Sequence, residues 1–289
     1  MHNCLNAGVR VLLLGWIFLT LGLAPISAQV RSNALQDLPK LKPQEATELL
    51  DAVRTARLRG DYCLHVALSQ IPRKGPQVTT YSVIWGTWNA QGPCMRVEIF
   101  PDGGRNSPNT TQWLLQNGAR PEAWVAKPGC EAEKLTGAAL YEPIMPGLEM
   151  SAFELQMGFL YWPEAKYIGP QRLKGRCAQC FELTAPEGSL SPYPFARVAL
   201  DSGFYCVLKA ELFDKQGKVA RVLKILDFKK AGEQWIVQSL DDVNMHTHSK
   251  TRVQVIAAAL GLSLPASLFT PQALTSTPPA LAPEHFVLF

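Results

Sequence analysis

Charge is scarce in this sequence. Charged residues make up 18% of its 289 residues, and 28 lysines and arginines against 24 aspartates and glutamates give a formal net charge of +4. Domains that bind nucleic acid gather basic residues on one face, whereas these are scattered, so we expect no nucleic-acid partner. Hydrophobic residues reach 47%. Such a composition indicates a chain that folds around a core and excludes disorder over most of its length.

The motifs of the common enzyme classes are also lacking. The chain contains no Gly-x-Ser-x-Gly elbow, no phosphate loop ending in Gly-Lys-Ser/Thr, no Gly-x-Gly-x-x-Gly and no His-Glu-x-x-His. His246 and His248 share one face of a strand, but no acid or thiol lies at ligand spacing, so an exposed strand end is favoured over a metal site. We therefore predict no enzyme activity, no cofactor and no metal.

A long apolar run occurs only at the N-terminus. Arg10 precedes the apolar residues 11–23, and residues 24–28 end in Ser-Ala before Gln29. This order is typical of a secretory signal peptide, residues 1–28. A membrane span needs about 20 apolar residues, so an uncleaved anchor is the less favoured alternative. No cysteine follows the run for lipid attachment, and we expect a periplasmic protein with no stable membrane span after signal cleavage.

Seven cysteines are present, of which Cys4 leaves with the signal. The other six could form up to three disulfides in an oxidising compartment. Cys177 and Cys180 form a CxxC motif within a segment of period two, where residues three apart point to opposite faces. Buried thiols or a structural disulfide are therefore favoured over a redox pair or a zinc site. Cys177 and Cys206 both share a face with apolar neighbours, which suggests a Cys177–Cys206 disulfide.

The remaining pattern predicts one domain over residues 43–258, after an extended lead-in at 29–42. Residues 43–59 predict an amphipathic helix that buries Leu49, Leu50 and Val53. Ser151 and Glu154 form a capping box that opens a short, very apolar helix. Period-two segments predict strands near 62–68, 78–88, 94–100, 113–115, 123–126, 166–174, 176–185, 195–201, 203–214, 218–230, 233–243 and 249–257. Prolines beyond residue 259 predict a disordered tail, 259–289.

Helices combined with one antiparallel sheet indicate an α+β fold, in which the helices cover a concave sheet face. Such a face can hold a ligand in place of a full core. An ordinary core is the simpler interpretation for any single residue. As candidates to line such a ligand site we take Leu49, Leu50, Val53, Trp85, Trp88, Phe153, Met157, Phe159, Leu160 and Trp162.

Several segments in a fixed order resemble a known family. They are residues 155–162 (Leu-Gln-Met-Gly-Phe-Leu-Tyr-Trp), 167–169, 174–177, 181–183, 205–218, 235–237 and 250–253. In this order they are similar to the outer-membrane lipoprotein-sorting proteins, relatives of the carrier LolA and its receptor LolB. The resemblance covers residues 140–256 well and 44–100 loosely.

The resemblance implies an unclosed half β-barrel with a helical lid formed by the helix at 43–59 and by residues 151–162. It further implies a carrier that shields the acyl chains of a lipoprotein or another lipid on the way to the outer membrane. Its partners would be that ligand, an inner-membrane transporter and an outer-membrane acceptor. Two alternatives stay open, namely a non-catalytic envelope interaction module with a self-filled barrel and a CxxC thiol-disulfide protein.

Overall fold

The computed structural model describes residues 38–289, with the exception of residues 105, 106, 119 and 174. The predicted signal peptide and most of the predicted lead-in lie outside the described residues. No helix in the described part of the chain is both long and apolar enough to cross a membrane.

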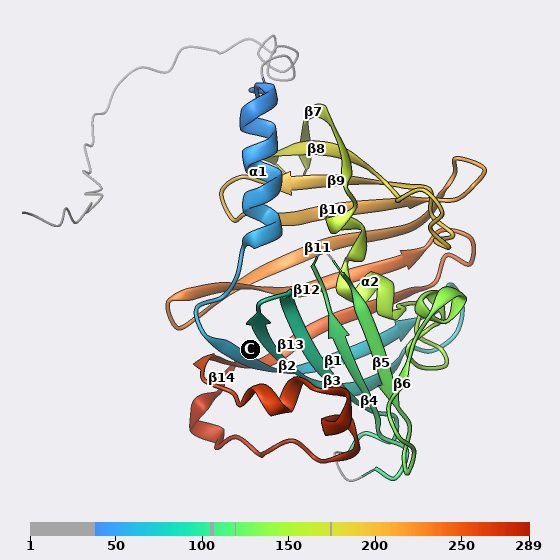
Figure 1. The fold of residues 1–289 in the computed structure, drawn as a ribbon, viewed down its shortest axis with the longest axis vertical. Helices are drawn as coiled ribbons and strands as arrows, with labels where there is room; N and C mark the ends of the chain where they lie inside the picture. The colour runs from blue at the N-terminus through green and yellow to red at the C-terminus, as the bar shows by residue number, and fades with distance from the viewer. Residues whose placement is uncertain (1–37, 105–106, 119, 174) are drawn as a thin grey trace, which may run out of the picture. The chain divides into compact units, whose positions relative to one another are not determined.

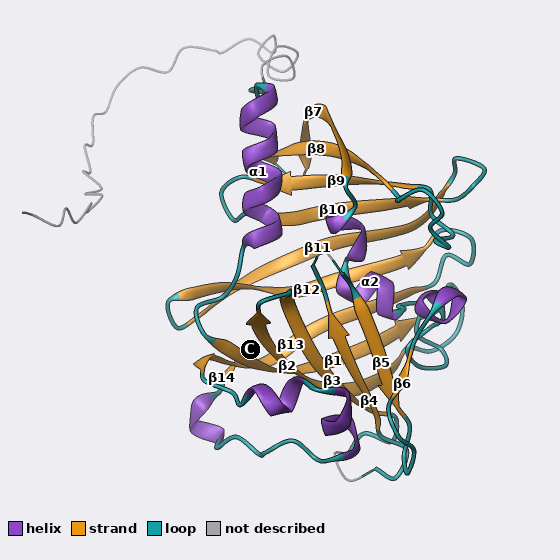
Figure 2. Cartoon of the chain, viewed as in Figure 1, coloured by secondary structure: helices purple, strands orange, loops and turns teal. Residues whose placement is uncertain are grey.

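Strands dominate the described residues (Figure 2). The helices are α1 (Pro43–Thr55) and α2 (Ala152–Gln156), and the 3₁₀ helices are η2 (Gly137–Tyr141), η3 (Gly158–Tyr161), η4 (Ala266–Phe269), η5 (Pro271–Thr275) and η6 (Pro283–His285). The strands are β1 (Asp61–Ile71), β2 (Val78–Asn89), β3 (Gly92–Phe100), β4 (Thr111–Gln116), β5 (Glu122–Ala126), β6 (Glu133–Lys134), β7 (Glu164–Leu173), β8 (Arg176–Thr184), β9 (Phe195–Asp201), β10 (Cys206–Phe213), β11 (Val219–Ala231), β12 (Gln234–Asn244), β13 (Lys250–Leu262) and β14 (Val287–Leu288).

The strands form one antiparallel sheet in the order β6-β5-β4-β3-β2-β1-β13-β12-β11-β10-β9-β8-β7, and β14 pairs with β13. Hairpins join most neighbours, and the pairing of β1 with β13 unites the early and late strands. β6 and β7 lie at the two ends of the order, so the sheet is not closed. The predicted fold class, an unclosed half barrel with a helical part, is confirmed.

Helices α1, α2 and η3 cover the inner face of this sheet (Figure 1). Ala46, Leu49, Leu50 and Val53 of α1 are buried against β8 to β11, as the apolar stripe predicts. The helix ends at Thr55, earlier than predicted, because the chain turns into extended backbone at Ala56 and crosses to β1. The loop before α2 contributes Ile144, Leu148 and Met150 to a second cluster with β1 to β5, β12 and β13.

The C-terminal segment differs from our prediction of a disordered tail. β13 continues to Leu262, and the residues after it form η4, η5, η6 and β14. Leu268 and Leu274 of this segment are buried against the outer face of β1 to β5. Proline content alone suggested disorder, but the leucines between the prolines cover an apolar sheet face that would otherwise meet water. We call residues 263–289 the strap.

A leucine pair in the strap tests this packing. Leu274→Ala should destabilise the protein by about 2–4 kcal/mol, because it removes a fully buried side chain and leaves a cavity. Leu288→Ala is the matched control, since Leu288 is 78% exposed, and should have almost no effect. Urea unfolding measures both. Equal stability of the two variants would contradict the ordered strap.

Candidate functional site

Most of the residues predicted to line the ligand site belong to the lid and lie together between the lid and the sheet. Leu49, Leu50 and Val53 from α1 and Phe153, Phe159, Leu160 and Trp162 from α2, η3 and the residue after η3 are buried in one cluster with β8 to β11, and Met157 packs against it. Aromatic rings fill much of this space, with the rings of Phe153 and Trp162 6.0 Å apart. These side chains pack against one another, so the inner face beneath the lid is filled by the protein itself.

The two tryptophans of β2 face different ways. Trp88 lies toward the end of the strand, beside the α1–β1 connection. Trp85 is fully buried on the outer face, with Cys63, Phe100 and Leu268 of the strap. Its neighbour Ile84 is the residue that faces the inner cluster. Because side chains alternate along a strand, Trp85 points away from the inner face, and our prediction that it lines the ligand site was wrong.

An arginine of α1 binds the second part of the lid. Arg54 donates from Nε to the carbonyl oxygen of Leu160 at 2.7 Å and from Nη2 to that of Trp162 at 2.8 Å. In return, Tyr161 donates its hydroxyl to the carbonyl oxygen of Arg54 at 3.1 Å. These three bonds join α1 to η3 where η3 ends and exposes its carbonyl groups. In the sequence, Arg54 had only the ordinary appearance of a basic residue in the last turn of a helix.

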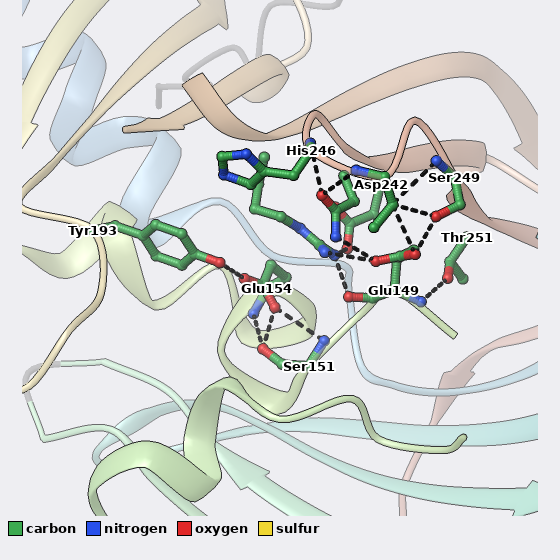
Figure 3. A network of polar contacts seen from close by, with 11 residues as sticks. Glu149, Ser151, Glu154, Tyr193, Asp242, His246, Ser249 and Thr251 are labelled. Carbon is green, nitrogen blue, oxygen red and sulfur yellow. Dashed lines mark hydrogen bonds and ion pairs between the residues drawn. The ribbon is translucent and has the colours of Figure 1, made fainter. Parts of the chain in front are cut away.

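The capping box predicted at Ser151 is present and leads into a buried polar network (Figure 3). Ser151 donates its backbone N–H to Glu154 Oε2 at 2.9 Å. The other oxygen of Glu154 accepts from the hydroxyl of Tyr193 at 3.0 Å. Glu154 is therefore held both by its own helix start and by the loop before β9.

The same network holds the loop before α2 on the sheet (Figure 3). Arg221 of β11 binds Asp242 of β12 and the carbonyl oxygen of Glu149, and it donates to Glu149 Oε2 at 3.2 Å. Asn244 donates to the same carboxylate at 2.8 Å. Hydrogen bonds from Ser249 and Asn244, with the charge of Arg221, outweigh burial and lower the pKa of Glu149. Arg221 thus contacts two carboxylates, those of Glu149 and Asp242, from a buried position and fixes the loop before α2 to β11 and β12.

A groove opens beside the lid, where α1 ends and the chain crosses to β1. Its volume is about 420 Å³. It is lined mainly by apolar and aromatic side chains: Val53, Ala56, Leu58, Tyr62, Leu64, Trp88, Pro93, Tyr161, Phe204, Tyr205, Trp235, Ile236 and Val237, with Arg54, Arg57, Gly60, Thr87 and Cys206. Ligand pockets commonly have about 300–1,000 Å³ and such a lining. Trp235 and Tyr205 at its rim are 51% and 49% exposed.

Tyr62 shapes one wall of the groove. Its ring lies over Gly86 of the neighbouring strand, where a Cβ atom would come within 1.9 Å of the ring, so only glycine fits there. Burial raises the pKa of Tyr62 to about 12, and the phenol is therefore neutral. Neither Tyr62 nor Ile236, which also belongs to the inner core, was among the candidates from the sequence. Their apolar character marked them only as core residues.

The predicted Cys177–Cys206 disulfide is not formed, since both thiols are free and β9 lies between their strands. A bulge between Val207 and Lys209 shifts the alternation of β10. Cys206 consequently packs with Ala178, Cys180 and Leu208, a separate cluster from that of Phe181. Burial also raises the pKa of Cys180, which opposes the thiolate that a redox CxxC requires.

The histidines of the predicted strand end lie in the turn between β12 and β13. His246 Nε2 is 3.9 Å from Asp214 Oδ2, and both groups belong to turns at the sheet margin. Across the described residues, no group of three or more His, Cys, Asp and Glu side chains is arranged to hold a metal ion.

Removal of the Arg54 side chain should loosen the lid. Hydrogen bonds from a charged donor contribute about 1.5–3 kcal/mol each, so Arg54→Ala should speed hydrogen exchange of the amides in α2 and η3 by at least about tenfold. Arg59→Ala, an exposed arginine beyond the helix, is the control and should leave exchange unchanged. Equal exchange in both variants would show that Arg54 does not hold the lid.

The buried network predicts a specific pH dependence. Burial raises the pKa of Asp242 to about 7, and the carboxylates of Glu154 and Glu149 add to this, while Arg221 opposes it. In an unfolded chain the pKa of Asp is about 3.9. Between about pH 4 and pH 7, Asp242 therefore carries a proton in the native state and has lost it in the unfolded state. The contribution of this raised pKa to the stability of the native state is complete below about pH 4 and is lost as the pH rises through 7.

Asp242→Asn should therefore lose that part of the pH dependence. In urea unfolding, the wild-type protein should lose stability between pH 5 and pH 8, and the variant should lose clearly less. Glu149 has a lowered pKa and titrates below this range, so it does not interfere. An identical slope in both proteins would be evidence against a buried proton on Asp242.

Comparison with known proteins supports the architecture. A family model described as an uncharacterized protein matches residues 155–276. Among curated protein sequences, no match is found. A domain from Vibrio parahaemolyticus, described as an outer membrane lipoprotein-sorting protein domain, is 16% identical, with a TM-score of 0.69, over 80% of this chain and 97% of that one.

Two further structures are similar. A DUF1329 family protein from Desulfovibrio piger is 15% identical, with a TM-score of 0.69, over 80% of this chain and 98% of that chain. A LolA superfamily protein from Nitrosomonas europaea is 13% identical, with a TM-score of 0.60, over 78% and 97%. These identities are low, and what they establish is the fold. The chain has the LolA-like fold that its sequence resemblance implied.

Proposed function

We propose that the protein is a non-catalytic carrier that shields lipoprotein acyl chains or another lipid in an apolar groove. The observation that carries this proposal is the position of the groove. Val53, Arg54 and Tyr161 belong to the lid and also line the groove, and Ile236 belongs both to the groove and to the inner core. An acyl chain that enters here meets the edge of the lid-covered face.

The energetics suit an acyl chain. Each methylene group removed from water contributes about 0.8 kcal/mol, so a lined apolar groove suffices for binding. Arg54 joins the two parts of the lid, and polar contacts of Glu149, Glu154 and Gln156 hold its second part on neighbouring strands and loops. If those contacts open, the inner face beneath becomes available to a longer chain. The solved domain from Vibrio parahaemolyticus, which is described as lipoprotein-sorting, is consistent with this role.

The location and the partners that the sequence predicts are part of this proposal. Export by the signal peptide would place the carrier in the periplasm, between an inner-membrane transporter and an outer-membrane acceptor. Both partners follow from the sequence resemblance.

The self-filled inner face favours the alternative of an interaction module, with a partner strand added at a sheet edge. The edges argue against that mode of binding. β7 carries a bulge between Tyr167 and Gly169, and Pro170 in the same strand lacks a backbone donor. The opposite edge, β6, consists only of Glu133 and Lys134. Bulges, prolines and very short strands protect an edge from pairing. The groove is therefore the better candidate for a binding site.

A neutral probe tests this proposal. The dye N-phenyl-1-naphthylamine should bind the purified protein saturably, and dodecanol should displace it. Ala56→Trp fills the groove beside α1 and should weaken dodecanol binding by about tenfold or more. Ala280→Trp, at an exposed position of the strap, should leave it unchanged. A wild-type protein that binds neither compound, or equal binding by both variants, would contradict the proposed function.

A further inference from the structure

The lining of the groove has one unexpected property, which is its charge. Arg54 and Arg57 are the two charged residues in it, and no aspartate or glutamate contributes to the lining. An apolar groove that binds only a neutral chain has no need of a cation in its lining.

The two arginines differ in what they already bind. Arg54 is committed to the carbonyl oxygens of Leu160 and Trp162, and its Nη1 is 3.6 Å from Asp51 Oδ1. Arg57 is exposed, and within the described ranges it forms no ion pair with a carboxylate. Arg57 is therefore the cation of the groove that is able to accept an anionic group.

A cation–π contact orients Arg57. Its Cζ atom lies 5.8 Å from the ring centroid of Trp88, which also lines the groove. A guanidinium group over an aromatic face keeps its N–H edge free, and this edge matches the two oxygens of a carboxylate or phosphate. Trp88 itself is fixed on β2 opposite Pro93 of β3. The apolar side chains of Leu64, Ile236 and Val237 line the same space.

We propose that the ligand of this groove is an anionic amphiphile. Its acyl chain occupies the apolar lining, and its carboxylate or phosphate head group binds Arg57 at the mouth. This inference rests on the proposed function and makes it more specific, because a neutral acyl chain would use the lining and leave Arg57 unused. Arg57 is then the residue that determines the choice of head group.

Ligands of equal chain length and different head groups test this inference. Displacement of N-phenyl-1-naphthylamine is measured with dodecanoate, dodecyl phosphate, dodecanol and dodecyltrimethylammonium. One charge-assisted hydrogen bond corresponds to roughly tenfold in affinity or more. The wild-type protein should therefore bind at least one of the two anions about tenfold more tightly than dodecanol and bind the cation most weakly. Preference for the carboxylate or for the phosphate identifies the source of the negative charge.

Two variants test whether Arg57 causes the preference for anionic head groups. Arg57→Gln should remove the preference for the anions and leave dodecanol binding within about twofold. Arg59→Gln is the matched control, because Arg59 is a neighbouring exposed arginine that does not line the groove, and it should keep the preference. Circular dichroism confirms that both variants fold.

The outcomes separate the two proposals. If dodecanol and both anions bind the wild-type protein equally, or if Arg57→Gln keeps the preference, the anionic ligand is excluded while the carrier function stands. If none of the four compounds displaces the dye, the proposed carrier function itself fails, and the inference fails with it.

Discussion

An unclosed sheet imposes the main constraint on this protein. The order from β6 to β7 leaves the concave face open, so its apolar side chains would meet water unless another element covered them. α1, α2 and η3 supply this cover, and their buried residues form one cluster with the strands. The strap does the same for the outer face. The lid and the strap both follow from a sheet that has two apolar faces and no closure.

Polar contacts place the lid where apolar packing alone would leave its position open. Hydrophobic contacts are not directional, whereas Arg54 binds two particular carbonyl oxygens and Arg221 joins Glu149 to Asp242. This arrangement places the buried carboxyl groups of Asp242 and Glu154 near one guanidinium, and burial raises the pKa of Asp242. The groove lies at the end of α1, where this cover stops and the chain crosses to β1.

Much of the architecture could be predicted from the sequence. Alternation located nearly every strand, and the capping box located α2 through Ser151 and Glu154. Long-range pairing could not be predicted, because the union of β1 with β13 leaves no local pattern. Bulges could not be predicted from the sequence either. The bulge in β10 shifts the alternation of that strand, and the predicted Cys177–Cys206 disulfide is not formed. The site was partly predicted: the lid residues were found, but Arg54 and Arg57 had the ordinary appearance of basic residues near a helix end.

The most direct test of the central claim is to observe a bound chain. A crystal structure of the protein with 12-bromododecanol would locate the bromine by its anomalous signal. If the groove holds acyl chains, the bromine should lie among Tyr62, Leu64 and Ile236, near the edge of the lid. Bromine found only on the outer surface, or a groove without ligand at a saturating concentration, would contradict the account.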